Sequence, residues 1–328
     1  MRAYYVDAPG APFRTADVPR PVPATGQVLV RVHASGLNPL DTKIRLGKAE
    51  HANQPLPAVL GLDLAGVVAE AGPDVAKFRP GDEVYGMVGG VGGLQGTLAE
   101  FVAADAALLA RKPVNISMAE AAALPLSTIT AWEGLIDRAK VSPGQKVLVH
   151  AGAGGVGHIV VQLAVAFGAE VFATVSAEKA EIVRGFGATP IDYRSVSVKD
   201  YVAMHTGGSG FDAVYDTVGG ATIDASFAAV RRYTGHAVSC LGWSSHSLAP
   251  LSFRGATYSG VFTLLPLITG EGRAHHGEIL ARAAAIVEAG KLKPLVHRER
   301  FSPSRLDEAF TLVESGSLGK VVIEMQVL

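Results

Sequence analysis

The sequence contains very little cysteine: a single residue, Cys240, among 328. One thiol cannot close an internal disulfide, so the fold does not depend on an oxidising compartment. One cysteine also cannot supply the three or four ligands of a cysteine-based zinc site. Cys240 falls in a predicted buried strand, and we expect a small core residue there rather than a redox thiol.

An excess of charge of either sign is also missing, since 29 Lys and Arg stand against 30 Asp and Glu, for a net charge of -1. A protein that binds nucleic-acid phosphates needs a basic excess or stripe, so we expect no nucleic-acid partner. The most apolar long stretch, 158–175, is interrupted by Gln162, Gly168 and Glu170 and is unlike a membrane span. The N-terminus lacks the apolar segment of a signal peptide, and we expect a cytoplasmic enzyme with no membrane partner.

The length allows two domains with separate cores. The first third is β-rich, with three predicted strands at 27–33, 64–71 and 82–88. The glycine-rich segment 86–96 is so poor in side chains that we expect a mobile loop with little core. Ser117 and Glu120 have capping-box spacing and predict a helix start, and Pro125 is expected to end or kink that helix.

From residue 146 onward, predicted strands and helices alternate. The six strands are 146–151, 170–175, 190–193, 211–216, 236–241 and 257–263, and the helices are 155–168, 177–187, 196–205 and 221–232. This alternation is typical of a doubly wound parallel sheet, and six strands make a full dinucleotide-binding domain. Two tail helices, 276–290 and 303–315, precede a strand at 320–325, which we expect to rejoin the N-terminal β-rich domain.

The most specific motif is a glycine-rich turn, GAGGVG, directly after the first of these strands. Gly152 is expected to make the tight turn, Gly154 to let the backbone approach a pyrophosphate, and Gly157 to let the next helix pack on the strand. The helix N-terminus adds free N–H groups and a partial positive charge. With Gly155 and Val156, the turn predicts a dinucleotide phosphate site; the alternative is a glycine-rich turn with no ligand.

The end of the second strand bears on the choice between NAD and NADP. An NAD site places Asp or Glu at this strand tip to hold the ribose 2′-hydroxyl, but here the strand ends in Thr174, Val175 and Ser176. Ser176 can hydrogen-bond a 2′-phosphate, and Lys179 can pair with its charge. We therefore expect NADPH, with two alternatives open: Lys179 is an ordinary solvated residue, or Glu178 approaches the ribose.

Several motifs, taken together, resemble the medium-chain dehydrogenase/reductase superfamily, in its zinc-independent, quinone-oxidoreductase-like branch. They cover nearly the whole chain and are 35–42 (SGLNPLDT), 61–68 (GLDLAGVV), 78–84 (FRPGDEV), the glycine turn, 216–220 (DTVGG) and 319–323 (GKVVI). The resemblance implies an α/β fold, with a GroES-like β-rich catalytic domain and a doubly wound Rossmann parallel sheet. It places the catalytic domain at 1–123 and 264–328 and the dinucleotide-binding domain at 124–263, with the active site in the cleft between them.

The same resemblance argues against zinc. Zinc alcohol dehydrogenases of this superfamily have a cysteine where Asn38 stands, a histidine where Leu62 stands, and a further cysteine near 120–128, where this chain has none. Only the acid Asp63 of such a ligand set remains. We therefore expect no metal, and a substrate that accepts a hydride without a Lewis acid, such as a quinone or an α,β-unsaturated carbonyl compound.

The resemblance gives four candidate catalytic residues, Asn38, Asp41, Lys43 and Thr130. Asn38 would lie near the nicotinamide ribose or the substrate oxygen, unless it only forms a turn before Pro39. Asp41 or Lys43 would donate a hydrogen bond or relay a proton, although an ordinary salt bridge is the commoner role of such residues. Thr130 resembles the family's nicotinamide-side hydroxyl, with back-bonding to its own helix as the alternative.

The resemblance also implies cofactor contacts at the strand ends and in the C-terminal segment. They are Tyr193 after the third strand, Val218 and Gly219 after the fourth, Leu241 and Gly242 after the fifth, Phe262 at the end of the sixth, and Gly319 with Lys320. Core packing is the alternative for Tyr193 and Phe262. Candidates for the substrate cleft are Trp132, Trp243 and His246. His275 and His276 are expected on the surface.

The leading functional hypothesis is a zinc-independent, NADPH-dependent reductase that transfers a hydride to a quinone or a related activated carbonyl compound. One alternative is an enoyl or 2-alkenal reductase on the same scaffold, and another is a non-catalytic, crystallin-like nucleotide-binding protein. The sixth strand, 257–263, is apolar and is expected at a sheet edge, where exposed strands invite pairing. We therefore expect a homodimer formed by edge-to-edge strand addition, acting on a small-molecule substrate.

Overall fold

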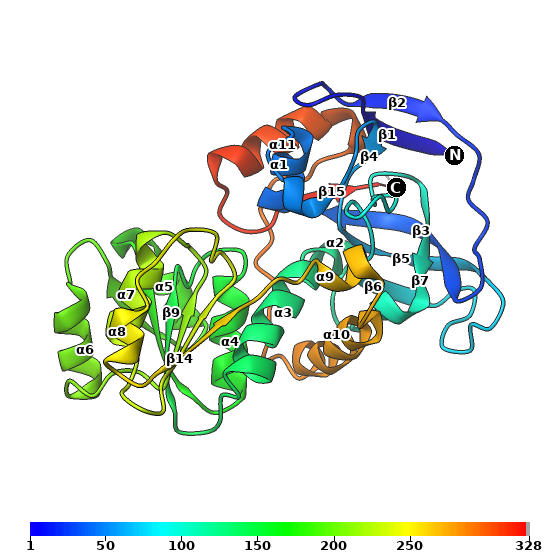
Figure 1. Cartoon of the computed structure of the whole chain (residues 1–328). Helices are drawn as coiled ribbons and strands as arrows, with labels where there is room; N and C mark the ends of the chain where they lie inside the picture. The colour runs from blue at the N-terminus through cyan, green and yellow to red at the C-terminus, as the bar shows by residue number, and fades with distance from the viewer. Residues whose placement is uncertain (326–328) are drawn as a thin grey trace. The chain divides into compact units, whose positions relative to one another are not determined.

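A computed structural model describes residues 1–325 and has the mixed α/β fold that the sequence predicts (Figure 1). The chain divides into two compact units. Unit 1 comprises Met1–Leu126, Leu264–Ala289 and Pro294–Leu328, and unit 2 comprises Ser127–Thr263 and Gly290–Lys293. Within residues 1–325, no helix is long and apolar enough to cross a membrane.

Unit 1 contains an antiparallel sheet in the order β15-β3-β5-β6-β8, with β7 also paired to β3, and a smaller sheet in the order β2-β1-β4. Its strands are β1 (Arg2–Val6), β2 (Arg14–Asp17), β3 (Gln27–Gly36), β4 (Ala58–Val59), β5 (Asp63–Ala71), β6 (Glu83–Met87), β7 (Phe101–Asp105), β8 (Leu109–Arg111) and β15 (Val322–Glu324). Its helical segments are α1 (Pro39–Arg45), η1 (Glu50–Ala52), η2 (Ala106–Leu108), α2 (Met118–Ala122), α9 (Leu265–Thr269), α10 (Arg273–Glu288), η5 (Pro303–Arg305) and α11 (Leu306–Ser315).

Strand β3 organises this sheet, because β5, β7 and β15 all pair with it. At its carboxyl end, Gly36 lies opposite Asp63 of β5 and Val322 of β15. The C-terminal strand therefore rejoins the β-rich unit, as predicted. This pairing brings together three segments that are far apart in the sequence, and the candidate residues Asn38 and Lys320 lie on two of them.

The expectation that segment 86–96 contributes little core is wrong. Val88 and Val91 are buried in unit 1, with 4% and 0% of their surface exposed. The glycines make this packing feasible, since a Cβ at Gly90 would lie 2.6 Å from the carbonyl oxygen of Gly61. The segment is therefore a packed part of unit 1.

The helix boundaries in unit 1 follow local sequence signals. The hydroxyl of Ser117 accepts a hydrogen bond from the Glu120 backbone N–H at 3.2 Å, so the predicted capping box does begin α2. This helix ends at Ala122, before Pro125, which begins the next helix. In the tail, α10 begins at Arg273 and carries His276 on its buried side, so the surface position expected for His276 is wrong.

Unit 2 is a six-stranded parallel sheet, as the sequence predicts, and its strands lie in the order β11-β10-β9-β12-β13-β14. Its strands are β9 (Lys146–His150), β10 (Glu170–Val175), β11 (Thr189–Asp192), β12 (Ala213–Asp216), β13 (His236–Ser239) and β14 (Thr257–Gly260). Its helices are α4 (Gly157–Ala166), η4 (Ala177–Lys179), α5 (Ala180–Gly185), α6 (Val198–Thr206), α7 (Ala221–Ala229) and α8 (Ala249–Ser252). Helix α3 (Pro125–Trp132) leads into this unit and continues as a π-helix, η3 (Glu133–Arg138).

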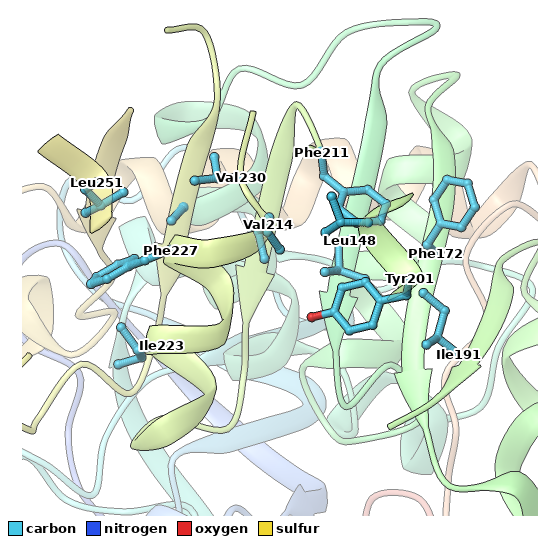
Figure 2. Close-up of a cluster of buried hydrophobic side chains, with 13 residues drawn as sticks. Leu148, Phe172, Ile191, Tyr201, Phe211, Val214, Ile223, Phe227, Val230 and Leu251 are labelled. Atoms are coloured by element: carbon cyan, nitrogen blue, oxygen red, sulfur yellow. The ribbon is translucent and has the colours of Figure 1, made fainter. Parts of the chain in front are cut away.

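The strand order changes direction at β9, which pairs with β10 on one side and β12 on the other. Ligands of such sheets bind at the carboxyl ends of the strands beside this switch point. A buried apolar cluster ties the strands to the helices, with Leu148 of β9 and Phe172 of β10 packed near Tyr201 of α6 (Figure 2). The packed sheet is therefore a rigid scaffold that positions the loops at the carboxyl ends of its strands.

Candidate active site

The glycine-rich turn follows β9. At two of its glycines, the neighbouring atoms leave no room for a side chain. A Cβ at Gly152 would lie 2.5 Å from the Ala173 Cβ of the neighbouring strand, and a Cβ at Gly157 would overlap the carbonyl oxygen of Ala151. The left-handed backbone of the turn falls on Ala151, with φ 55°, and not on Gly152. Gly152 thus serves close packing, which differs from the tight-turn role we expected, while Gly157 lets α4 approach the strand as predicted.

The middle of the same turn is open. A Cβ at Gly155 would meet nothing within 4 Å, and at Gly154 it would meet only atoms of Ala151, the nearer at 3.1 Å. Both glycines are exposed and Val156 is half-buried. Helix α4 begins at Gly157, and the N–H groups of His158, Ile159 and Val160 bond to the carbonyl oxygens of Gly154 and Val156. The turn therefore offers an anion the open backbone at Gly154 and Gly155 and the partial positive charge of the helix N-terminus.

A buried histidine at the end of β9, His150, packs next to this turn. His150 is 3% exposed, and its Nδ1 lies 3.2 Å from the hydroxyl oxygen of Thr174. Burial lowers the pKa of His150 to about 4, so the imidazole is neutral at physiological pH. The hydroxyl of Thr217 donates to the His150 carbonyl oxygen at 2.7 Å. These contacts join the carboxyl ends of β9, β10 and β12 beneath the turn.

Residues at the ends of β10 and β11 form a polar surface. Ser176 is 6% exposed at the end of β10, and Lys179 is exposed three residues later. Beyond β11, Tyr193 is 56% exposed, so the core-packing alternative for it is wrong. The Arg194 guanidinium lies 5.6 Å from the centre of the Tyr193 ring and 3.7 Å from the Glu178 carboxylate. The Arg194 charge thus partly offsets the negative charge of Glu178, which would otherwise repel a phosphate.

The carboxylate of Asp216 shapes the carboxyl end of β12. It accepts hydrogen bonds from the backbone N–H groups of Val218 and Gly219, at 3.0 and 3.1 Å, and from the Ser239 hydroxyl at 2.6 Å. The carboxylate is fully buried, and Val218 in the turn that it holds is 48% exposed.

Cys240 follows β13 and is not inside the strand. Burial raises the pKa of its thiol to about 12, which fits an inert thiol.

The remaining candidates of unit 2 follow β13 and β14. Leu241 is half-buried and Gly242 is exposed. Phe262 lies beyond the last residue of β14, Gly260, because this strand is shorter than predicted. The rings of Phe262 and Trp243 meet edge to face, with centres 5.8 Å apart.

Unit 1 brings the candidates Asn38 and Lys320 into one buried polar cluster with Asp63. The Asn38 Nδ2 donates to Asp63 Oδ2 at 3.1 Å, and the Lys320 ammonium donates to Asn38 Oδ1. The ammonium also lies 3.3 Å from Asp63 Oδ2, and the backbone N–H of Leu126 donates to Asp63 Oδ1 at 3.0 Å. Gly319 has φ 82°, a left-handed conformation that suits glycine and leads the chain into Lys320.

Asp41 caps the same cluster from helix α1. Its Oδ2 accepts the backbone N–H of Asn38 at 2.8 Å, so Asn38 is a helix N-cap as well as a member of the cluster. The other oxygen, Oδ1, is buried without a hydrogen-bond partner. Burial raises the pKa of Asp41 to about 7, helped by the nearby Asp63 and opposed by the Asn38 N–H and by Lys320. Burial likewise raises the pKa of Asp63.

The two catalytic candidates of helix α1, Asp41 and Lys43, differ in burial. Asp41 is 0% exposed, whereas Lys43 is exposed. The ordinary salt bridge that we considered for these residues therefore does not describe Asp41, which bonds to backbone instead. Lys43 remains a candidate only as an exposed ammonium.

Thr130 is 5% exposed and its hydroxyl oxygen lies 3.0 Å from that of Thr263, which in turn donates to Glu133 Oε2 at 3.2 Å. Reasoning from the sequence singled out Thr130 and missed Thr263, which bonds to it, and Glu133, which bonds to Thr263. Arg194 was considered only together with Tyr193, and no pattern indicated that it pairs with Glu178. Thr263 and Glu133 carry no motif, and only the fold places them together.

Comparison with known proteins identifies the family of this chain over most of its length. The family model described as Alcohol dehydrogenase GroES-like domain matches residues 24–114, and that described as Zinc-binding dehydrogenase matches residues 155–269. A protein of Arabidopsis thaliana named NADPH-dependent alkenal/one oxidoreductase, chloroplastic, is 39% identical over 306 residues, which cover 90% of this chain and 72% of that protein.

Solved structures agree with this placement. The crystal structure of an alcohol dehydrogenase superfamily protein from Novosphingobium aromaticivorans is similar with a TM-score of 0.98 and 55% identity, covering 99% of this chain and 100% of the other. The quinone oxidoreductase from Coxiella burnetii has a TM-score of 0.83 and 30% identity, with 99% of each chain covered.

The name of the second family model raises the question of zinc. Leu62 is a fully buried apolar side chain, and Asn38 is bonded to Asp63 and Lys320. The ammonium of Lys320 is the cation beside the Asp63 carboxylate, at 3.3 Å. Among residues 1–325, no group of three or more His, Cys, Asp and Glu side chains could hold a metal ion. This donor set does not fit zinc, which needs at least three such ligands.

Proposed function

This chain belongs to the medium-chain dehydrogenase/reductase superfamily, in its quinone-oxidoreductase-like branch, and on that premise we propose an NADPH-dependent, zinc-independent reductase of quinones or related activated carbonyl compounds. The chain is an oxidoreductase, so the non-catalytic alternative is not pursued. Units 1 and 2 are proposed to be the catalytic and dinucleotide-binding domains expected at 1–123 with 264–328 and at 124–263.

The observation that carries the proposal is the glycine-rich turn at the switch point of the parallel sheet. Its exposed backbone at Gly154 and Gly155, with the N-terminus of α4 behind it, suits a pyrophosphate. When bound, the reduced nicotinamide of such a dinucleotide supplies the hydride. The part of this chain is to bind and orient the dinucleotide and to exclude water.

The preference for NADPH over NADH rests on the polar surface beyond β10 and β11. Lys179 offers an exposed ammonium, and Arg194 adds a second cation near Glu178. The Ser176 hydroxyl is buried and bonds to the Glu178 carboxylate, and we propose that it exchanges this bond for one to the phosphate. The strand tip itself carries no acid, which an NAD site uses for the ribose 2′-hydroxyl. These residues together favour a ribose that bears a 2′-phosphate.

The catalytic assignments of Asn38, Asp41, Lys43 and Thr130 stay proposals. In unit 1, Asn38 would be held in one orientation by its contacts with Asp63 and Lys320. An amide oriented in this way recognises a ligand group without rotating, which is how a preorganised site lowers a barrier. We likewise propose that the cofactor contacts are Tyr193, Val218, Leu241, Gly242, Phe262, Gly319 and Lys320.

A second candidate function is reduction of the C=C bond of a 2-alkenal or enone. The named Arabidopsis thaliana relative favours it, since that protein is an alkenal/one oxidoreductase of similar sequence. Both substrate classes accept a hydride without a metal, because aromatisation drives quinone reduction and conjugation activates the alkenal. The same dinucleotide site serves either reaction.

The test measures oxidation of NADPH by metal-stripped protein, with 1,4-benzoquinone and separately with a 2-alkenal. Turnover with the quinone alone supports the leading proposal, and turnover with the alkenal alone favours the second candidate. Activity that depends on added zinc would overturn the metal-free assignment. A cytoplasmic location and a homodimer paired through the edge strand β14 are part of the proposal, and a monomeric mass by light scattering would contradict the dimer.

A further inference from the structure

The carboxylate of Glu178 lies among the groups proposed to bind the 2′-phosphate. It accepts hydrogen bonds from its own backbone N–H and from the Ser176 hydroxyl, and one of its oxygens lies 3.7 Å from the Arg194 guanidinium. These two hydrogen bonds, with smaller contributions from the charges of Arg194 and Lys179, lower the pKa of Glu178. The side chain is therefore an anion at neutral pH, and it is surrounded by donors.

The donors are held more firmly than the carboxylate that they bind. Ser176 is buried at the end of β10. The backbone N–H of Arg194 donates to Asp192 Oδ1 at 3.1 Å, and the guanidinium lies over the Tyr193 ring. The Glu178 side chain, by contrast, is 62% exposed. The carboxylate can therefore turn away into solvent while its donors stay in place.

A 2′-phosphate needs the partners that Glu178 uses. Proteins bind phosphate groups with hydroxyl, ammonium and guanidinium donors, and Ser176, Lys179 and Arg194 provide one of each. Two anions that lie side by side repel each other, so a phosphate and the Glu178 carboxylate exclude one another from these donors. The carboxylate is thus a competitor built into the chain.

NADH carries a hydroxyl where NADPH carries this phosphate. A hydroxyl can donate to a carboxylate, whereas a phosphate dianion has no hydrogen to give. In NAD sites of doubly wound sheets, an Asp or Glu holds the ribose 2′-hydroxyl in this way. Glu178 follows the tip of β10 closely, in η4, where it can serve the same purpose. The same carboxylate therefore opposes one dinucleotide and assists the other.

We propose that Glu178 determines cofactor specificity by occupying the 2′-phosphate position in the ligand-free protein, so that NADPH displaces its carboxylate while NADH retains it as the acceptor for the ribose 2′-hydroxyl. This inference rests on the proposed dinucleotide site. The preference for NADPH is a difference between two affinities, and Glu178 narrows that difference from both sides. Lys179 and Arg194 supply the opposing preference.

The first test is fluorescence titration of the protein with NADPH and with NADH. Glu178→Gln keeps the size of the side chain and removes its charge, so NADPH should bind roughly threefold to tenfold more tightly. Glu181→Gln is the matched control, because Glu181 is an exposed acid of α5 that bonds to Arg184. It makes the same change in net charge and should leave both affinities unchanged.

The second test isolates the ribose hydroxyl and begins with the wild-type protein. NADH should bind roughly threefold to tenfold more tightly than its analogue without the 2′-hydroxyl of the adenosine ribose, the effect of one hydrogen bond. Glu178→Ala removes the acceptor and should bring the ratio of the two dissociation constants close to one. Glu181→Ala should leave that ratio as it is in the wild type. Thermal unfolding checks that each variant is folded.

The outcomes separate this inference from the proposed function. Unchanged or weaker NADPH binding by folded Glu178→Gln protein, or an equal gain in Glu181→Gln, would overturn this inference alone. A ratio near one in the wild type, or a ratio that survives Glu178→Ala, would do the same. Failure of the folded wild-type protein to bind either NADPH or NADH would overturn the proposed function, and this inference with it.

Discussion

The ammonium of Lys320 lies 3.3 Å from the carboxylate of Asp63, with 6% and 0% of the two side chains exposed. A buried ion pair is costly to break, because the remaining charge stays buried without a partner. We therefore expect Lys320→Met to lower the free energy of unfolding by about 3–5 kcal/mol at neutral pH. Urea denaturation of variant and wild type gives this difference.

The control for this prediction is an exposed pair in the same unit. Arg300 and Glu324 are bonded at 2.6 Å with more than a third of each side chain exposed. Arg300→Met should cost less than about 1 kcal/mol, the range for surface pairs. A cost for Lys320→Met no larger than that of Arg300→Met would mean that Lys320 does not compensate the Asp63 charge.

Asp41 makes stability depend on pH in a direction opposite to that of most acids. Burial raises its folded-state pKa to about 7, above the ordinary value for a carboxyl group. The folded protein thus binds this proton more tightly than the unfolded chain, so the contribution to stability is complete at acid pH and is lost as the pH rises towards 7. Asp41→Asn removes the titrating group and keeps an oxygen for the Asn38 N–H.

The Asp41→Asn variant should therefore gain stability relative to wild type as the pH rises. Between about pH 4 and pH 7 the gain should approach 1.4 kcal/mol for each pH unit. Urea denaturation at several pH values measures it. A difference between the two proteins that stays constant with pH would show that the Asp41 carboxyl titrates normally in the folded state.

Local patterns predicted the parts of this molecule that depend on neighbours in the sequence. The capping box at Ser117 and the strand from Glu170 to Val175 lie where the sequence puts them. The parallel sheet followed from alternating strands and helices, because that alternation has few other solutions. Short strands such as β4 were missed, since two residues carry no periodicity.

The candidate sites show where this reasoning ends. Asn38 and Lys320 are 282 positions apart, and each was singled out by a separate motif. Their contact depends on β15 pairing with β3, and the sequence predicted only that the last strand returns to this domain. Thr263 carries no motif and reaches Thr130 and Glu133 through tertiary packing alone. Burial of Val91 was missed because a glycine-rich segment gave no sign of what would pack over it.

Two glycines of the turn have different proposed roles: Gly157 allows close packing, and Gly155 leaves open backbone for a ligand. Gly157→Ala would place a Cβ against the carbonyl oxygen of Ala151, so we expect a loss of stability of about 1–3 kcal/mol. Gly155→Ala meets nothing within 4 Å and should leave stability unchanged. If a pyrophosphate approaches the exposed turn, Gly155→Ala should nevertheless weaken NADPH binding several-fold. Thermal unfolding and titration with NADPH measure the two effects, and unchanged NADPH affinity in a normally stable Gly155→Ala protein would contradict the phosphate site.

The choice between NADPH and NADH is tested at Lys179. The two dinucleotides differ only in the 2′-phosphate, so a residue that pairs with this group should affect one and spare the other. Lys179→Glu removes a cation and adds an anion beside Glu178, and we expect NADPH binding to weaken roughly 10–100-fold with little change for NADH. The effect should shrink at high ionic strength, because Lys179 is exposed and its charge is screened.

Lys140 provides the matched control for Lys179. It is an exposed lysine of the same unit in the segment that leads into the amino end of β9, opposite the proposed ligand edge of the sheet. Lys140→Glu makes the same change in net charge and should leave both affinities unchanged. Equal weakening of NADPH and NADH by Lys179→Glu would mean that Lys179 does not read the 2′-phosphate. A loss of NADPH binding in Lys140→Glu as large as in Lys179→Glu would mean that net charge, and not a local contact, sets the preference.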